Sequence, residues 1–268
     1  MTNRTLPTYF ISHGGGPWPW MADALTGRYA GLAAALRDMP TQIGRKPRAV
    51  LMVSAHWEEP DFTVMAHPQP PMLYDYSNFP EHTYRIRYPA SGDPQLATEV
   101  KDLLERSGIA TAIDSQRGFD HGMFSPMAVI YPEADVPTVQ LSLKHGLDLQ
   151  THLALGRALA PLRDEDVLIV GSGLSYHNLR MFGEAGRAPS AKFDAWLSQT
   201  LAMTEPRERS AELARWELAP AAREAHPREE HLLPLMVALG AAEGDGATRV
   251  YHEDSFGAGL TVSSYRFG

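Results

Sequence analysis

Short runs of apolar residues that end abruptly in polar residues or glycine alternate with helical patterns along this chain. The clearest run is Val50–Ala55, which ends at His56, a tryptophan and two glutamates. A continuous run of Val, Leu and Met is typical of a strand buried in a parallel sheet. Amphipathic patterns such as Asp93–Arg106 and Leu149–Leu162 separate the runs. The alternation predicts an α/β fold: a single domain spanning residues 1–268, with a central, mostly parallel or mixed sheet flanked by helices.

Composition narrows the classes of function. The chain has 268 residues, is 44% hydrophobic and carries a net charge of −8, which argues against nucleic-acid binding because phosphate contacts need clustered Lys and Arg. No apolar run approaches the length of a membrane span and no signal-peptide pattern is seen, so we expect a soluble, cytoplasmic protein. Cysteine is absent while histidine occurs 11 times. Any transition metal must therefore be held by His, Asp or Glu.

Three histidines follow predicted strands. His13 follows Thr8–Ser12, His56 follows the run described above, and His177 comes a few residues after Val167–Val170. Because the carboxyl ends of parallel strands meet at one edge of a sheet, we expect these side chains to converge. Three imidazoles at one edge can form a catalytic metal site with open positions for substrate. For each histidine alone, hydrogen bonding to local backbone groups is the more common explanation, and only the three together favour a metal site.

Two further histidines have weaker contexts. His121 lies in Arg117–Pro126 (RGFDHGMFSP), a segment predicted as a loop because glycine and proline punctuate it. His231 lies in the first turn of a predicted helix, Pro227–Ala242, next to leucines. From this context alone, a hydrogen-bonded core histidine is the simpler interpretation of His231.

A serine hydrolase is a competing hypothesis. The sequence HGGG after the first predicted strand matches the oxyanion-hole segment of lipase-like hydrolases. That fold also needs a nucleophile in the pattern G-x-S-x-G, and the segment Gly171–Ser175 (GSGLS) does not satisfy it. The hydrolase interpretation is therefore poor.

Five short motifs occur in the order found in a known family. They are SHGGGPW at 12–18, VSAHWE at 53–58, FDHGMFSP at 119–126, GSGLSYHNLR at 171–180 and EHLLPLMVALGAA at 230–242. Together they resemble the class III extradiol ring-cleaving dioxygenases, and within them the DOPA 4,5-dioxygenase-like branch. The resemblance runs from about Thr8 to the end of the chain. Each motif is short, but five in the same order are specific.

The resemblance implies a non-haem metal at one edge of the sheet, with Fe(II) expected and Zn(II) as the alternative. By position, His13, His56 and His231 match the metal ligands of this branch. His177 matches the acid–base histidine, which zinc-loaded relatives can recruit as a fourth ligand. His121 matches a second active-site histidine near the dioxygen side. The implied reaction opens the ring of a catechol with O2 and gives a muconic semialdehyde-type product.

The third ligand has an alternative in the adjacent Glu230. Successive residues of a helix point about 100° apart, so Glu230 and His231 cannot both face one metal from a regular helix. We choose His231 and keep Glu230 as the fallback. Two other functions also remain open: a zinc-dependent hydrolase that uses the same histidines, and a non-catalytic metal-binding relative.

Further expectations concern the surroundings of the site. The segment His67–Pro89 has no period, which is typical of a functional or mobile loop. Aromatic residues in Pro17–Trp20 and Met72–Phe79 are suited to packing a flat ring. Trp57 and Glu58 are candidates for orienting the imidazole of His56. The sequence leaves the oligomeric state and the identity of the catechol open.

Overall fold

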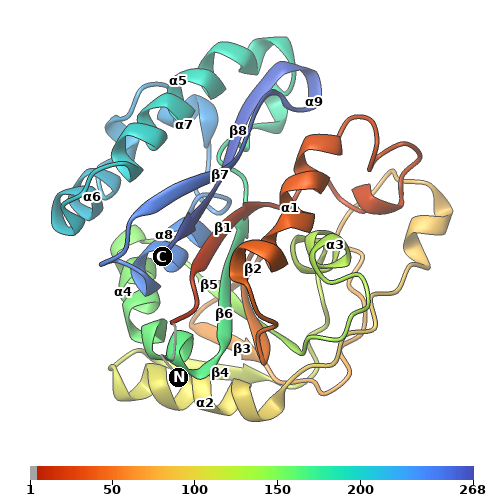
Figure 1. The fold of residues 1–268 in the computed structure, drawn as a ribbon, viewed down its shortest axis with the longest axis vertical. Coiled ribbons are helices and arrows are strands. Elements are labelled where there is room, and N and C mark those ends of the chain that lie inside the picture. The colour runs from red at the N-terminus through yellow and green to blue at the C-terminus, as the bar shows by residue number, and fades with distance from the viewer. Residues whose placement is uncertain (1–4) are drawn as a thin grey trace.

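The structure, a computed structural model, describes residues 5–268. Within this range the strands form one eight-stranded sheet in the order β4-β3-β5-β2-β6-β1-β8-β7 (Figure 1). The strands are β1 (Thr8–Ser12), β2 (Ala49–Glu59), β3 (Phe62–Met65), β4 (Thr111–Asp114), β5 (Thr138–Lys144), β6 (Val167–Gly173), β7 (Ala247–Ser255) and β8 (Leu260–Phe267). The predicted single α/β domain with a mixed sheet is confirmed.

Strand β6 lies between β1 and β2 and runs parallel to both. Strand β2 also pairs in parallel with β5, and β3 with β4. The antiparallel pairs are β3 with β5, β1 with β8 and β7 with β8. The three parallel strands β1, β6 and β2 therefore end side by side at one edge, where ligands bind in open α/β sheets.

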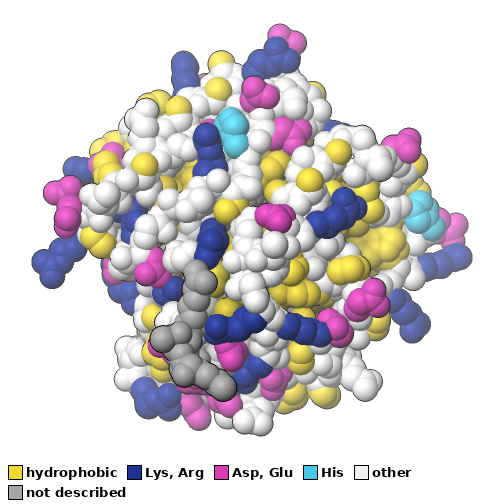
Figure 2. All heavy atoms as spheres, viewed as in Figure 1, with side chains coloured by type: hydrophobic (Ala, Val, Ile, Leu, Met, Phe, Trp, Pro, Cys, Tyr) yellow, Lys and Arg dark blue, Asp and Glu magenta, His cyan; other side chains and the backbone are white. Residues whose placement is uncertain are grey.

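Helices cover both faces of this sheet (Figure 1). The α-helices of residues 5–268 are α1 (Ala30–Ile43), α2 (Pro94–Arg106), α3 (His121–Ile130), α4 (Leu149–Leu159), α5 (Glu184–Leu201), α6 (Pro206–Leu213), α7 (Ala222–Ala225), α8 (Leu233–Ala241) and α9 (Phe256–Gly259). Short 3-10 turns are η1 (Trp18–Trp20), η2 (Glu81–Tyr84), η3 (Ala160–Glu165), η4 (Leu179–Met181) and η5 (Trp216–Leu218). Among the described residues, no helix is long and apolar enough to cross a membrane. Charged side chains of both signs are interspersed over the face shown in Figure 2.

The sequence Gly171-Ser172-Gly173 at the end of β6 shows how two helices approach the sheet from opposite faces. A Cβ on Gly171 would lie 2.1 Å from the carbonyl oxygen of Pro234, at the start of α8. The intervening Ser172 donates its hydroxyl to the carbonyl oxygen of Gly122 in α3. Successive strand residues point to opposite faces, so α8 and α3 sandwich this strand. The glycines admit the backbone before and within α8 rather than forming a nucleophile turn.

Three predicted boundaries near the site are wrong. Arg117–Pro126 is not a loop throughout, because α3 begins at His121 with the Asp120 side chain accepting the backbone N–H of Met123. The helix predicted over Pro227–Ala242 begins only at Leu233, and bends and turns precede it. His56 lies inside β2 rather than after it. In the first two cases, the helix begins where a capping side chain or a turn allows it, and not where the hydrophobic periodicity begins.

His226 is a buried core histidine whose contribution to stability depends on pH. Its ring packs against Phe193 and Trp216, and its Nε2 lies 3.0 Å from the carbonyl oxygen of Ser175. Burial lowers the pKa of His226 to about 4. Below an unfolded-state pKa of about 6.5, the unfolded chain therefore takes up a proton that the folded protein excludes.

The free energy of unfolding is thus expected to fall as the pH drops from about 6.5 towards 4, with His226 contributing about 3 kcal/mol of the loss. The effect of His226 is absent above that range, where the ring is neutral in both states. Urea unfolding of metal-free wild type and His226→Gln at pH 7 and pH 4.5 measures it. The variant should lose less stability between the two pH values, and equal losses would contradict the assignment.

Candidate metal centre and active site

Five histidines meet in one cavity at the carboxyl edge of β1, β6 and β2. His13 follows β1 and His177 follows β6, as the sequence predicted, and His56 lies near the end of β2. His121 enters from the start of α3 and His231 from the turn before α8. The ring centroids of neighbouring histidines in this group lie between 3.3 and 5.4 Å apart. The structure therefore brings together all five histidines predicted for the site.

His13 is held by its own backbone. Its N–H donates to the carbonyl oxygen of Gly173 at 3.1 Å, and its carbonyl oxygen accepts the indole N–H of Trp18 at 2.7 Å. The following residue, Gly14, has φ +81°, and a Cβ there would lie 2.4 Å from the Trp18 ring. A side chain at Gly14 would be both strained and blocked, so the glycine allows the tight turn that leaves His13 at the cavity.

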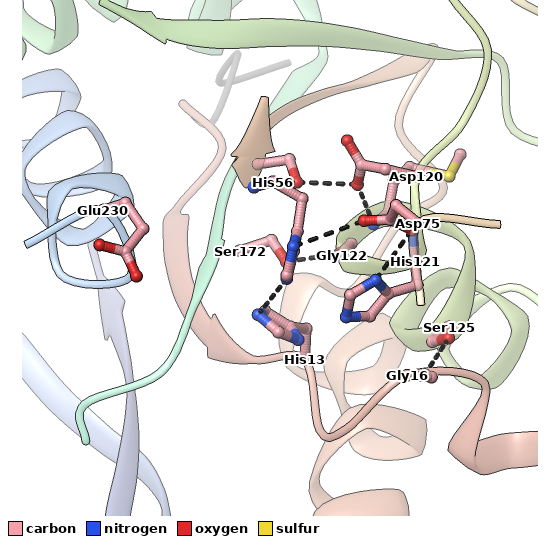
Figure 3. Close-up of polar contacts among 12 residues, drawn as sticks. His13, Gly16, His56, Asp75, Asp120, His121, Gly122, Ser125, Ser172 and Glu230 are labelled. Carbon is pink, nitrogen blue, oxygen red and sulfur yellow. Dashed lines mark hydrogen bonds and ion pairs between the residues drawn. The ribbon is translucent and has the colours of Figure 1, made fainter. Parts of the chain in front are cut away.

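His56 leaves β2 where that strand is irregular. The register with β5 shifts between Val53 and Glu58, as at a β-bulge, and bulges re-aim side chains at the edges of sheets. The imidazole packs against Gly122 of α3, where a Cβ would lie 2.9 Å from the ring carbon Cδ2. Its Nε2 faces the Nε2 of His13 at 3.3 Å (Figure 3).

His231 lies in a turn before α8 rather than in a regular helix. The side chains of Glu230 and His231 are therefore not constrained to point about 100° apart. The carbonyl oxygen of His231 accepts the N–H of Leu174, and Gly173 lacks the Cβ that would collide with that oxygen. The Glu230 Oε1 lies 2.8 Å from the Nδ1 of His231. Both side chains therefore face the cavity, with the carboxylate contacting the imidazole.

His177 stacks on His231. The two rings lie 3.3 Å apart between centroids with an interplanar angle of 18°. The Nδ1 of His177 lies 3.1 Å from Glu230 Oε1, the same oxygen that contacts His231. The His177 side chain is 20% exposed, whereas that of His231 is 4% exposed. His177 is thus the more accessible of the stacked pair.

His121 lies on the other side of His56, with 3.9 Å between their ring centroids. A carboxylate that the sequence did not single out, Asp75, contacts both rings. Its Oδ1 lies 2.9 Å from the Nδ1 of His121, and its Oδ2 lies 3.4 Å from the Nδ1 of His56 (Figure 3). The residues predicted to orient His56 have other partners: Trp57 donates its indole N–H to Glu59, and Glu58 pairs with Arg228.

The cavity that these residues line has a volume of about 600 Å³, within the range of small-molecule sites. Phe79 and Tyr29 contribute aromatic surface, and Leu179 and Phe182 at the rim are 71% and 41% exposed. Phe79 comes from the long loop that was predicted to pack a flat ring. Trp18, from the other predicted segment, is instead fully buried beneath Gly14.

Burial keeps three of the histidines neutral at pH 7. It lowers the pKa of His13 and of His231 well below the ordinary value, and neighbouring imidazoles lower both further. It also lowers the pKa of His56 to about 3. Burial alone would raise the pKa of the Asp75 carboxyl, but the N–H groups of His121 outweigh it and the net shift is downward. Neutral imidazole is the form that binds a metal ion.

The donor set fits a divalent transition metal. Two imidazole nitrogens bound to one ion at about 2.1 Å lie roughly 3.4 Å apart at a tetrahedral angle, close to the 3.3 Å between the Nε2 atoms of His13 and His56. The Nε2 of His231 is buried and has no hydrogen-bond partner among residues 5–268. The candidate ligand atoms of His13, His56 and His121 all lie within 4.8 Å of one another. A second such group comprises His177, Glu230 and His231.

Comparison with known families agrees with this geometry. The model of the catalytic LigB subunit of aromatic ring-opening dioxygenase matches residues 10–268. The chain belongs to this family. It is therefore an aromatic ring-opening dioxygenase, and the resemblance proposed from the five motifs is confirmed.

Named relatives of this dioxygenase match over nearly its whole length. A 4,5-DOPA dioxygenase extradiol of Beta vulgaris is 38% identical, covering 97% of this chain and 96% of the relative. The dioxygenase tasH of Hapsidospora irregularis is 36% identical over 98% of this chain and 85% of its own. The crystal structure of an uncharacterized Escherichia coli K12 protein matches with a TM-score of 0.79 and 30% identity, covering 98% of this chain and all of that one.

Two features of the site in this dioxygenase were not predicted from the sequence: the presence of Asp75 and the contact of Glu230 with two histidines. Asp75 lies between two tyrosines in the long loop, a segment without periodicity in which no sequence pattern singles out the carboxylate. A usable signal existed, because a metal-binding histidine commonly donates its second N–H to a carboxylate. Glu230 was considered only as a ligand, since a regular helix was expected at that position.

Proposed function

We propose that this dioxygenase uses Fe(II) and O2 to open the ring of a catechol-type substrate at a bond beside the diol, giving a muconic semialdehyde-type product. The observation that carries the proposal is the meeting of five histidines in one cavity of about 600 Å³. The names of the relatives support extradiol cleavage of a substituted catechol.

His13, His56 and His231 hold the metal in this proposal. The short distance between the first two Nε2 atoms, the unpartnered Nε2 of His231 and the lowered pKa of all three support the choice. His121 is the competitor for the third position because its ligand atom also lies near those of His13 and His56. His231 is preferred because its Nδ1 is hydrogen-bonded to Glu230 and its Nε2 is buried without a partner among the described residues, whereas the Nδ1 of His121 has no hydrogen bond there.

When bound, the ion would hold the diol and O2 together and carry charge between them. His177 would accept a proton from a catechol hydroxyl and return it later in the reaction. Its ring is accessible from the cavity, and Glu230 at 3.1 Å from Nδ1 leaves Nε2 for the substrate. His121 would face the substrate from the opposite side, next to Asp75.

Oxygen consumption tests the proposal directly. Anaerobic protein reconstituted with Fe(II) is expected to consume one O2 per catechol and to form a yellow product when air is admitted. Uptake should require both iron and an adjacent diol, so a mono-phenol of the same skeleton is the matched control. No oxygen uptake across a panel of substituted catechols would contradict the proposal.

The same His₃ donor set also suits zinc hydrolysis, because an ion held by three neutral imidazoles lowers the pKa of bound water. Zinc-loaded protein assayed without oxygen against ester and amide substrates separates the two functions. The dioxygenase proposal expects no turnover under these conditions. Turnover there, together with none for the iron form in air, would favour the hydrolase.

A further inference from the structure

Asp75 lies in the segment between β3 and α2, and contacts on both sides fix its position. Before it, Leu73 donates its N–H to the carbonyl oxygen of Phe119, and Met72 forms a β-bridge with the same residue. The flanking tyrosines are also tied down: Tyr74 donates its hydroxyl to Ile86 O at 2.8 Å, and Tyr76 donates to Thr83 O at 2.6 Å. The carboxylate is therefore held on a part of the loop that is clamped to the residues just before α3.

The Asp75 carboxylate faces two imidazoles at once. Its Oδ2 lies 3.4 Å from the Nδ1 of His56, and its Oδ1 lies 2.9 Å from the Nδ1 of His121. The same Oδ1 accepts the backbone N–H of His121 at 2.9 Å. Both Nδ1 atoms lie at ion-pair distance from the carboxylate, and the Nδ1 of His121 is buried without a full hydrogen bond to any described residue. Because an ionised carboxylate only accepts hydrogen bonds, its position favours a proton on both Nδ1 atoms. Both rings then present an Nε2 lone pair.

We propose that Asp75 is a positioning residue that fixes His56 and His121 as Nδ1–H tautomers, so that one carboxylate sets both a metal ligand and the second active-site histidine. The inference rests on the proposed function insofar as His56 is a ligand. Asp75 itself makes no bond to metal or substrate; it acts through the two rings.

Glu230 makes the corresponding bridge on the other side of the site. Its Oε1 lies 2.8 Å from the Nδ1 of His231 and 3.1 Å from the Nδ1 of His177. Asp75 and Glu230 lie on opposite sides of the His13–His56 pair in Figure 3. Each carboxylate thus joins one proposed ligand to one histidine proposed to act on substrate or dioxygen. The repeated arrangement favours a common role over two unrelated ion pairs.

The test is Asp75→Asn. The asparagine carbonyl can still accept the backbone N–H of His121, so the start of α3 is preserved. Its NH2 group is a donor and cannot accept from a second Nδ1–H, which favours the opposite tautomer of His56. We expect affinity for Co(II) or Zn(II), measured by competition with a chelator, to fall roughly 10- to 100-fold. Nitrogen-15 NMR of the metal-free variant should show the imidazole signals of His56 changing from Nδ1–H towards Nε2–H.

Asp114→Asn is the matched control for a merely structural role. Asp114 Oδ1 also accepts two backbone N–H groups, those of Gln116 and Arg117, but has no imidazole partner among its hydrogen bonds and ion pairs. That variant is expected to change stability alone. Glu230→Met supplies a second variant. A single oxygen, Oε1, faces both His231 and His177, so a glutamine could still accept from both rings, whereas methionine removes the acceptor and should give the same loss of metal affinity.

The outcomes separate this inference from the proposed function. If Asp75→Asn keeps wild-type metal affinity and wild-type tautomers, the positioning role is overturned even if the wild type cleaves catechols. If the wild type binds metal but cleaves no catechol, the proposed function fails, while altered tautomers and weaker binding in the variant still support the role of Asp75.

Discussion

Replacing His56 with alanine is expected to remove tight metal binding and reduce turnover to background. The Nε2 of His56 lies 3.3 Å from that of His13, and the variant would leave two imidazoles in place of three. Loss of an outer partner of a metal ligand typically costs roughly 10- to 100-fold in affinity, so loss of the ligand itself should cost more. Metal content after dialysis and oxygen uptake with a catechol are the two measurements.

His145→Ala is the control for this prediction, because His145 is an exposed histidine outside the cavity. It should keep both metal and activity. The metal-free forms of His56→Ala and wild type should also unfold at similar temperatures, and added metal should raise the transition temperature of wild type only. A His56→Ala protein that retains one equivalent of metal would refute the assignment of His56 as a ligand.

The same treatment of His121 and His231 decides between the two candidates for the third ligand. We expect His231→Ala to lose metal, because its Nε2 is buried and unpartnered. We expect His121→Ala to retain metal while turning over more slowly. The reverse pattern would assign the metal to His13, His56 and His121 instead, a group whose ligand atoms all lie within 4.8 Å of one another.

The parts of the fold that the sequence predicted well are those set by continuous apolar runs. Strand β1 was predicted with its observed bounds, and α2 within one residue. Both are governed by local signals: a β-rich run ended by His13 and glycine, and a helix with an Asp93 cap, an apolar face and a glycine stop. His13, His56 and His177 converge because their strands run parallel and lie side by side in the sheet. The sequence predicted a mostly parallel or mixed sheet but not the order of its strands.

The parts that the sequence could not give are those that depend on contacts between distant segments. Leu174 donates its N–H to the carbonyl oxygen of His231. The two residues are far apart in the sequence, so no local pattern predicts this contact. The turn that carries Glu230 and His231 exists because that backbone lies against Gly173. Asp75 reaches His56 because its loop is clamped to Phe119. In each case, tertiary packing placed a functional group where local propensity predicted a helix, or a functional or mobile loop without saying which of its residues would act.

The second large effect is expected for His177→Ala, which should keep the metal and lower kcat by about 10²- to 10⁴-fold. The ring of His177 stacks on His231, but the contact that orients His231 comes from Glu230 at 2.8 Å and does not pass through His177. Removal of the ring therefore leaves the proposed ligands in place and removes the proton acceptor. Metal content and steady-state oxygen uptake distinguish the two effects.

Chemical rescue makes this prediction sharper. The variant would leave an imidazole-sized space beside His231, open to a cavity of about 600 Å³, so added imidazole should restore part of the lost turnover. The rescued rate should rise with the concentration of the neutral base, because the missing step is proton acceptance. His121→Ala is the matched variant, and rescue confined to His177→Ala would place proton transfer at His177. Loss of metal from His177→Ala would instead make His177 a ligand, and the acid–base role would have to pass to His121.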